Sequence, residues 1–342
     1  MSEDLVERLL DGDHRALARA ITIIENRRPG YRDLVARLHR HTGTADIIGI
    51  TGSPGSGKST LVDKLAAAYR EQGLTVGVIA IDPSSPFTGG AVLGDRIRMV
   101  STIGDMDVFF RSMSARGTLG GLSTATADAV KALDAFGKDR IIIETVGAGQ
   151  NEIDIVKTAD TVTVLVPPGS GDDVQMLKAG ILEIADVFVV NKADRPGADR
   201  TVQELREMLE YRDGGVPRSV GHHGVGEFDA VEEDPSDGWE PEIVETVANQ
   251  GEGIENLIAV FDDHAAHLDQ SGERVDNARM RYAAEIRRLL REDVNTLVAA
   301  ELDRQGGLDS VVESVLTRET DPYTVVDELI DPLAECLDAH RE

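Results

Sequence analysis

A glycine-rich segment at residues 52–60 constrains this chain more than any other feature of its sequence. It follows the apolar run Ile47–Thr51 and precedes a helical stretch at residues 61–72. It matches the pattern G-x-x-x-x-G-K-[ST], whose glycines let backbone N–H groups point at phosphate oxygens while the next helix presents its positive end. The residues expected to contact a nucleotide are Gly52, Ser53, Pro54, Gly55, Ser56, Gly57, Lys58, Ser59 and Thr60. Lys58 is expected to reach the β- and γ-phosphates, and the Ser59 hydroxyl to ligate Mg²⁺.

Short apolar runs alternate with longer helical stretches from residue 46 onward. Runs that are continuously apolar indicate strands buried on both faces, and therefore a mostly parallel sheet flanked by helices. The expected strands are Ile47–Thr51, Val76–Ile81, Ile141–Thr145, Val162–Val166, Val187–Val190 and a last one near Ile243–Val247. The predicted fold class is α/β, a P-loop NTPase with helical extensions at both ends.

Three regions are expected along the chain. Residues 1–44 read as an N-terminal helical extension, and residues 45–268 as the P-loop domain. Residues 212–242 are rich in Gly, Pro and Asp and are expected to form a solvated acidic loop inserted before the last strand. Residues 269–342 carry an amphipathic stripe from Ala283 to Val298, which is expected to pack on its own domain or on a second copy.

The charge balance limits the classes of partner. The net charge is −27, from 62 acidic and 35 basic residues, and no basic patch of useful size is evident, so neither nucleic acid nor a membrane surface is an expected partner. An acid excess with only seven Lys resembles proteins of a very salty cytoplasm. The single cysteine, Cys336, excludes an internal disulfide and fits a reducing compartment. With no signal peptide or membrane span in the sequence, the expected location is the cytoplasm.

A second motif selects the base. Asn191, Lys192 and Asp194 form N-K-x-D directly after the strand at Val187–Val190. The Asp194 carboxylate can accept from both the ring N–H and the exocyclic amino group of guanine, a donor pair that adenine lacks. Asn191 can bond the base and brace neighbouring loops, and the Lys192 stem can lie over the ring. A backbone N–H near Ala248 is expected to meet the guanine oxygen.

Carboxylates at the ends of two further strands indicate hydrolysis. Glu144 ends one predicted strand and is expected to help hold Mg²⁺, while Gly147 lets a backbone N–H approach the γ-phosphate. Asp82 ends another strand and is expected to orient the attacking water, with Asp95 joining the metal shell. Candidates for stabilising transition-state charge are Arg96, Arg98, Arg111 and Arg116.

Taken together, these blocks resemble the MeaB/ArgK family, P-loop GTPases of the SIMIBI class associated with methylmalonyl-CoA mutase. The resembling blocks are residues 16–26, 49–65, 80–99, 108–122, 141–155 and 167–194. The resemblance implies slow GTP hydrolysis, a chaperone role that gates cofactor loading into adenosylcobalamin-dependent acyl-CoA mutases and protects them, and a homodimer held by C-terminal arms. It places the Mg²⁺ and catalytic positions on Lys58, Ser59, Asp82, Asp95 and Glu144. It also implies switch or partner-contact roles for Gln150, Asp172 and Lys178.

Three other functions fit parts of the same pattern. A nickel-delivery GTPase would need a Cys/His site near the switches, which a single Cys disfavours. A small-molecule kinase would not need the guanine motif at Asn191–Asp194. A P-loop protein that only binds nucleotide would not need Lys58, Ser59, Asp82 and Glu144 all intact.

Overall fold

The computed structural model describes residues 2–82, 101–102, 104–114, 121–145, 158–169, 184–213, 238–304 and 306–339. The chain divides into two compact units, Met1–Asn277 and Ala278–Glu342. The predicted boundary before the C-terminal region, at residue 268, lies upstream of this division.

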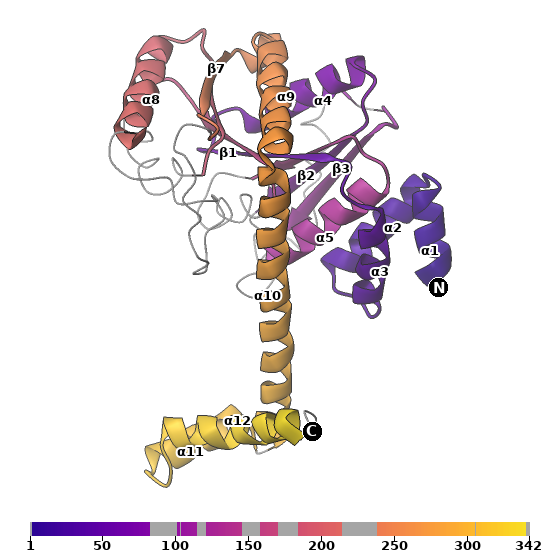
Figure 1. The fold of residues 1–342 in the computed structure, drawn as a ribbon, viewed down its shortest axis with the longest axis vertical. Helices are drawn as coiled ribbons and strands as arrows, with labels where there is room; N and C mark the ends of the chain where they lie inside the picture. Colours follow the sequence, from indigo (N-terminus) through magenta and orange to yellow (C-terminus); the bar gives the residue numbers. More distant parts are fainter. Residues whose placement is uncertain are drawn as a thin grey trace. The chain divides into compact units, whose positions relative to one another are not determined.

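A single parallel sheet forms the centre of the first unit (Figure 1). In the described part of the chain its order is β3-β2-β4-β1-β5-β6-β7, and every neighbouring pair is parallel. The strands are β1 Asp46–Gly52, β2 Val76–Asp82, β3 Val108–Ser114, β4 Arg140–Glu144, β5 Thr161–Val166, β6 Val187–Asn191 and β7 Glu242–Thr246. The predicted α/β class is therefore confirmed. The edge strand β3 was not among the predicted strands, because Arg111 and Ser112 interrupt its apolar run.

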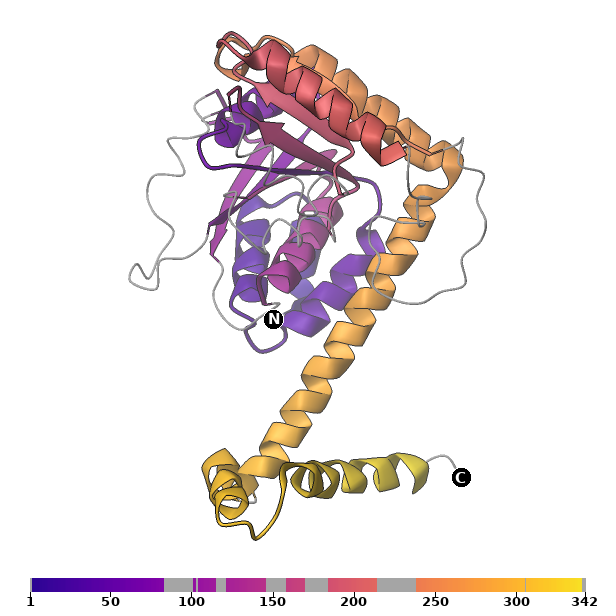
Figure 2. The same ribbon diagram turned by 90° about the vertical axis from the view of Figure 1, so that its left-hand side faces the viewer.

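Helices cover both faces of this sheet (Figures 1 and 2). The described helices that lie wholly in the first unit are α1 Ser2–Leu10, α2 His14–Glu25, α3 Tyr31–Leu38, η1 His39–His41, α4 Lys58–Glu71, α5 Gly121–Ala135, α8 Ala198–Asp213, η3 Ala248–Gln250 and α9 Ile254–Ser271. Neighbouring residues of a strand point to opposite faces, and the two cores follow that alternation. Ile79 and Ile141 pack with α1–α3 and α5, whereas Val78 and Ile142 pack with α4 and α9. A third cluster joins α8 to β5 and β6.

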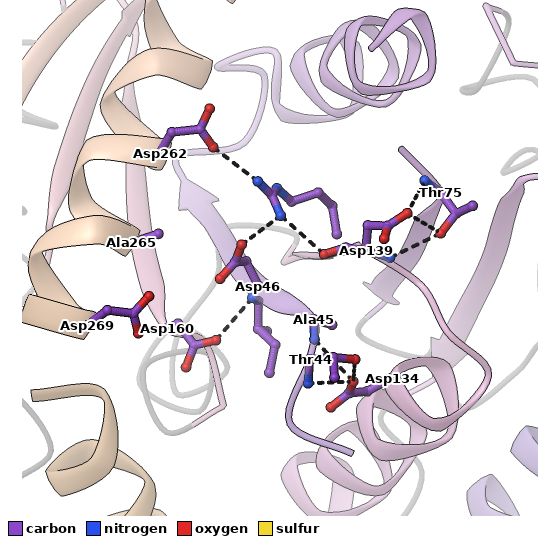
Figure 3. Close-up of polar contacts among 12 residues, drawn as sticks. Thr44, Ala45, Asp46, Thr75, Asp134, Asp139, Asp160, Asp262, Ala265 and Asp269 are labelled. Carbon is purple, nitrogen blue, oxygen red and sulfur yellow. Dashed lines mark hydrogen bonds and ion pairs between the residues drawn. The ribbon is translucent and has the colours of Figure 1, made fainter. Parts of the chain in front are cut away.

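The N-terminal helices share the core of the P-loop domain. Leu17 and Ile21 of α2 are fully buried in the same cluster as Leu133 of α5. The chain then passes into β1 through a connection held by one carboxylate. Asp134 of α5 accepts from the backbone N–H groups of residues 43, 44 and 45 at 2.6, 3.2 and 3.1 Å. Figure 3 shows the contacts with Thr44 and Ala45.

A network of charges ties the strands together at the amino ends of β1 and β4. Arg140 contacts Asp46 at 2.6 Å and Asp262 at 3.1 Å (Figure 3). Burial alone would lower the pKa of Arg140, but Asp46, Tyr69 and Asp262 together raise it, so the guanidinium stays charged. Arg274 contacts the other oxygen of Asp46 at 3.1 Å. This network lies at the opposite edge of the sheet from the phosphate loop.

The prediction that the chain has no basic patch is wrong for the N-terminal helices. Residues 14–41 contain seven Arg and only two acidic residues, although the whole chain carries −27. Most of these arginines are exposed on α2, α3 and the turns beside them. The whole-chain charge hid this local excess.

The second unit consists of most of α10 (Glu273–Arg304) together with α11 (Gly307–Leu316) and α12 (Pro322–Ala339). Large apolar side chains are exposed along all three helices; on α10 they include Tyr282, Ile286, Leu290, Val294 and Leu297. Spacings of three and four place these α10 residues on one stripe. No helix in the described ranges is long and apolar enough to cross a membrane.

Candidate active site

The phosphate loop joins the end of β1 to the start of α4, as the sequence predicted. Its two motif glycines are required by close packing and by their backbone conformations. A Cβ on Gly52, at φ +140°, would lie 2.3 Å from the Leu165 oxygen, and one on Gly57, at φ +101°, would lie 2.3 Å from Asn191 Nδ2. Helix α4 then begins at Lys58 with no side-chain cap on its first turn. Its leading N–H groups are therefore placed to bind an anion.

Lys58 lies across the loop that it follows. Its ammonium donates to the backbone oxygens of Gly52 and Ser53 at 2.7 and 2.9 Å, and its side chain is largely buried. Two hydroxyls of the same loop, Ser53 Oγ and Ser56 Oγ, are buried and have no hydrogen-bond partner in the structure. Since buried hydroxyls are normally paired, these donors suit a ligand rich in oxygen acceptors.

Ser59 and Glu144 meet beside the loop. The Ser59 Oγ donates to Glu144 Oε1 at 2.5 Å, and Glu144 as a residue is 7% exposed. Glu144 stands opposite Ile50 of β1 and Ala80 of β2, so it lies between the strands that end at the phosphate loop and at Asp82. A hydroxyl and a carboxylate converging at a phosphate site are oxygen ligands of the kind that Mg²⁺ takes, and so this pair fits the ion.

Of the other residues predicted for metal binding and switching, the structure describes only the backbone of Asp82. The backbone of Asp82 ends β2, at the same edge of the sheet as Glu144, and its side chain lies outside the described part. Asp95, Gly147, Gln150, Asp172 and Lys178 also lie outside the described residues.

The side chain of Asn191 joins three segments of the site. Its Nδ2 donates to the Ser56 oxygen at 2.8 Å, and its Oδ1 accepts from Thr246 Oγ1 and from the Ala248 N–H, both at 3.1 Å. Asn191 itself is 2% exposed. The phosphate loop, the N-K-x-D loop and the loop after β7 are therefore fixed to one another by a single amide.

The rest of the guanine motif adopts a strained but supported turn. Lys192 has a φ of +64°, and its ammonium donates to the Gly55 oxygen at 2.6 Å. Ala193 N–H donates to the Thr246 oxygen at 3.0 Å, and the Asp194 side chain is exposed beside it. The Ala248 N–H is used by Asn191, so the contact of that group with guanine stays a prediction.

Gly253 is a residue of this region that sequence reasoning missed. A Cβ there would lie 2.2 Å from the Glu245 oxygen, so only glycine lets the start of α9 approach the end of β7. Val247 N–H also donates to the Glu252 oxygen at 3.0 Å, which closes the loop around Ala248. The available signal was Gly251 and Gly253 standing two apart before a helix.

The structure does not support Arg111 as a candidate for stabilising transition-state charge. It lies in the middle of the edge strand β3 and pairs with Glu25 of α2 at 2.5 Å. On the same strand, Met113 belongs to the core beneath the N-terminal helices and Phe109 packs against it. Arg96, Arg98 and Arg116 lie outside the described residues.

No cluster of three or more His, Cys, Asp or Glu residues that could hold a metal ion occurs within the described ranges. His264 is buried, with its Nδ1 2.8 Å from Thr161 Oγ1. Its ring also lies against Trp239. This histidine belongs to the packing of α9 on the sheet.

Replacing Asp194 with Asn is expected to weaken GDP binding by roughly 10- to 100-fold, because a carboxylate that accepts twice from guanine is lost. The same variant should bind xanthosine diphosphate better than the wild type does, since the Asn amide can donate to the xanthine 2-oxygen. Titration with fluorescent nucleotides measures both affinities, and Asp199→Asn, on the exposed start of α8, is the matched control. Unchanged GDP affinity, or wild-type affinity for ADP equal to that for GDP, would refute the assignment.

Comparisons with known proteins agree with this geometry. The family model described as methylmalonyl Co-A mutase-associated GTPase MeaB matches residues 17–303. A Pyrococcus horikoshii protein with a provisional GTPase name is 46% identical over 331 residues, covering 97% of this chain and 98% of that protein. GTPase ArgK of Escherichia coli is 34% identical over 303 residues, covering 86% of each chain. A mouse protein named methylmalonic aciduria type A homolog, mitochondrial, is 31% identical and matches 84% of this chain and 68% of its own length.

A solved structure described as LAO/AO transport system kinase covers 97% of both chains with a TM-score of 0.65 and 23% identity, which supports the fold. The family match and the identities establish what the phosphate and guanine motifs had indicated. The chain belongs to the MeaB family of methylmalonyl-CoA mutase-associated proteins and is a P-loop GTPase.

Proposed function

We propose that this GTPase is a chaperone for an adenosylcobalamin-dependent acyl-CoA mutase, gating cofactor loading and protecting the mutase from inactivation. The observation that carries the proposal is the match to a family named for its association with methylmalonyl-CoA mutase, over residues 17–303. The mouse relative, named for methylmalonic aciduria, supports the same assignment. GTP binding and hydrolysis at the site would supply the signal that times the mutase's cofactor exchange.

The chemistry of the site is proposed as follows. Guanine nucleotide is bound by the phosphate loop and by Asn191, Lys192 and Asp194. Ser59 and Glu144, with Asp82 and Asp95, would hold Mg²⁺, which would supply positive charge to neutralise the phosphates. Lys58 leaves the Gly52 and Ser53 oxygens to contact the phosphates. This exchange replaces two hydrogen bonds to neutral carbonyls with contacts to anionic oxygens, which are stronger.

Nickel delivery is the second candidate, and the described residues do not favour it. The single cysteine, Cys336, stands near the C-terminus, and the described part of the chain contains no cluster of three or more His, Cys, Asp or Glu residues that could hold a metal ion. A kinase role is disfavoured by the buried Asn191 contacts, which organise a guanine site.

The chaperone role predicts a nucleotide-dependent complex. The full-length chain should bind an acyl-CoA mutase from the same genome with an affinity that differs between GDP and a non-hydrolysable GTP analogue, and the mutase should change the rate of GTP hydrolysis. Biolayer interferometry and a phosphate-release assay measure the two effects.

A partner-contact variant sharpens this test. Lys178→Ala should weaken the complex while the isolated chain keeps its GTP hydrolysis, and Arg200→Ala, on the exposed face of α8, should leave both unchanged. No binding in any nucleotide state would contradict the proposal. Binding to a nickel enzyme instead would favour the second candidate.

A homodimer is also proposed, and the exposed apolar stripe of the second unit supports it. Contiguous apolar side chains on the surface of a monomer normally mark an interface. On α10, α11 and α12 these side chains are separated by one or two helical turns. A second copy of the same helices would cover them.

Leu290→Asp is expected to convert the dimer to a monomer, because it places a charge at the centre of the proposed interface. Size-exclusion chromatography with light scattering should give about twice the 36.8 kDa monomer mass for the wild type and the monomer mass for the variant. Asn295→Asp adds the same charge to an exposed position of α10 and should leave the dimer intact. A monomeric wild type would refute the dimer.

A further inference from the structure

Two buried threonines lie at the ends of β1 and β4, beside the phosphate loop and Glu144. Thr51 is the last residue before Gly52 of the phosphate loop, and Thr145 is the first residue after Glu144. Both side chains are fully buried, and their hydroxyl oxygens lie 2.9 Å apart. Neither hydroxyl is exposed to the space where a nucleotide would bind.

The backbone continues the pairing of β1 and β4 up to this point. Ile50 stands opposite Glu144 in the parallel register, and Thr145 N–H donates to the Ile50 oxygen at 3.0 Å. The hydroxyl contact is thus a cross-strand pair placed one step beyond the last backbone pairing. β-Branched side chains have few rotamers, so the contact also fixes the direction in which each chain leaves its strand.

The groups proposed to hold Mg²⁺ lie close to these two strand ends. Ser59 follows Thr51 through the phosphate loop, and Glu144 precedes Thr145 in the chain. The 2.5 Å contact between Ser59 Oγ and Glu144 Oε1 depends on the separation of β1 and β4 where the two strands end. A displacement of about 1 Å in such a group can lower a rate by about 100-fold.

We propose that Thr51 and Thr145 are positioning residues for hydrolysis, holding Glu144 at the distance from Ser59 that the metal requires. The proposal rests on the roles proposed for Ser59 and Glu144. It requires that the hydroxyl pair act through geometry, because both threonine side chains are fully buried.

The test uses isosteric variants of the full-length chain. Thr51→Val and Thr145→Val keep the shape and remove one hydroxyl each. We expect kcat for GTP hydrolysis to fall at least about tenfold. The gain in GTP-analogue affinity on adding Mg²⁺, compared with EDTA, should shrink severalfold, while affinity in EDTA stays within about twofold of the wild type.

The sheet offers a matched control. Thr163 of β5 is also fully buried, and its hydroxyl has no hydrogen-bond partner in the structure. Thr163→Val should leave kcat and the Mg²⁺-dependent gain in affinity unchanged. Thr145→Ser retains the hydroxyl and should keep most of the wild-type Mg²⁺ effect, and it serves as the folded comparison if a valine variant unfolds.

A double-variant cycle gives the sharpest outcome. If the hydroxyls act through each other, Thr51→Val with Thr145→Val together should be no worse than the worse single variant. Independent, additive losses would overturn the proposal, as would valine variants with a wild-type Mg²⁺ effect. Glu144→Gln distinguishes a failure of the role proposed for Glu144 from a failure of the positioning role proposed for the threonines. If that variant also keeps the wild-type Mg²⁺ effect, the role of Glu144 fails and this inference fails with it. If only the threonine variants behave as wild type, the role of Glu144 stands.

Discussion

The site depends on the three hydrogen bonds of the Asn191 side chain. One amide donates to the phosphate loop at Ser56 and accepts from Thr246, the last residue of β7, and from Ala248 in the loop that follows. Ser56 lies 135 positions from Asn191 in the sequence, and Thr246 and Ala248 lie 55 and 57 positions from it. A buried amide paired on both its nitrogen and its oxygen is costly to disturb, so it holds the phosphate-binding and base-binding loops in one arrangement.

The parallel sheet makes this arrangement available. Strands β1, β4, β6 and β7 all end at one edge, so the residues that follow them meet there. Close contacts then require glycine at Gly52, Gly57 and Gly253, where a Cβ would fall 2.2–2.3 Å from a neighbouring atom. The opposite edge is held by the charges around Asp46 and Arg140. Ligand chemistry and structural ion pairing are therefore separated along the length of the strands.

The sequence allowed prediction of those parts of the fold and the site that local patterns encode. The phosphate loop and N-K-x-D each occupy a short run, and continuous apolar strands indicate a parallel sheet. Contacts between residues on different strands could not be predicted from local patterns. Two contacts join residues that are distant in sequence: Thr51 with Thr145, and Arg111 with Glu25. At Gly253 the determinant is instead the close approach of its backbone to Glu245. β3 was missed because its edge position tolerates an arginine in the middle of the strand. The basic stretch at residues 14–41 was missed because the charge was summed over the whole chain.

The central claim is that Asn191 fixes the loop after β7 before any nucleotide binds, and amide hydrogen exchange of the nucleotide-free protein tests it most directly. The Ala248 N–H donates to Asn191 Oδ1, so in Asn191→Ala this amide should exchange at least about tenfold faster, while the amides of β6 keep their protection. Asn249→Ala, which changes an exposed neighbour, should leave the Ala248 rate as in the wild type. Equal Ala248 exchange in the wild type and in Asn191→Ala would contradict the account.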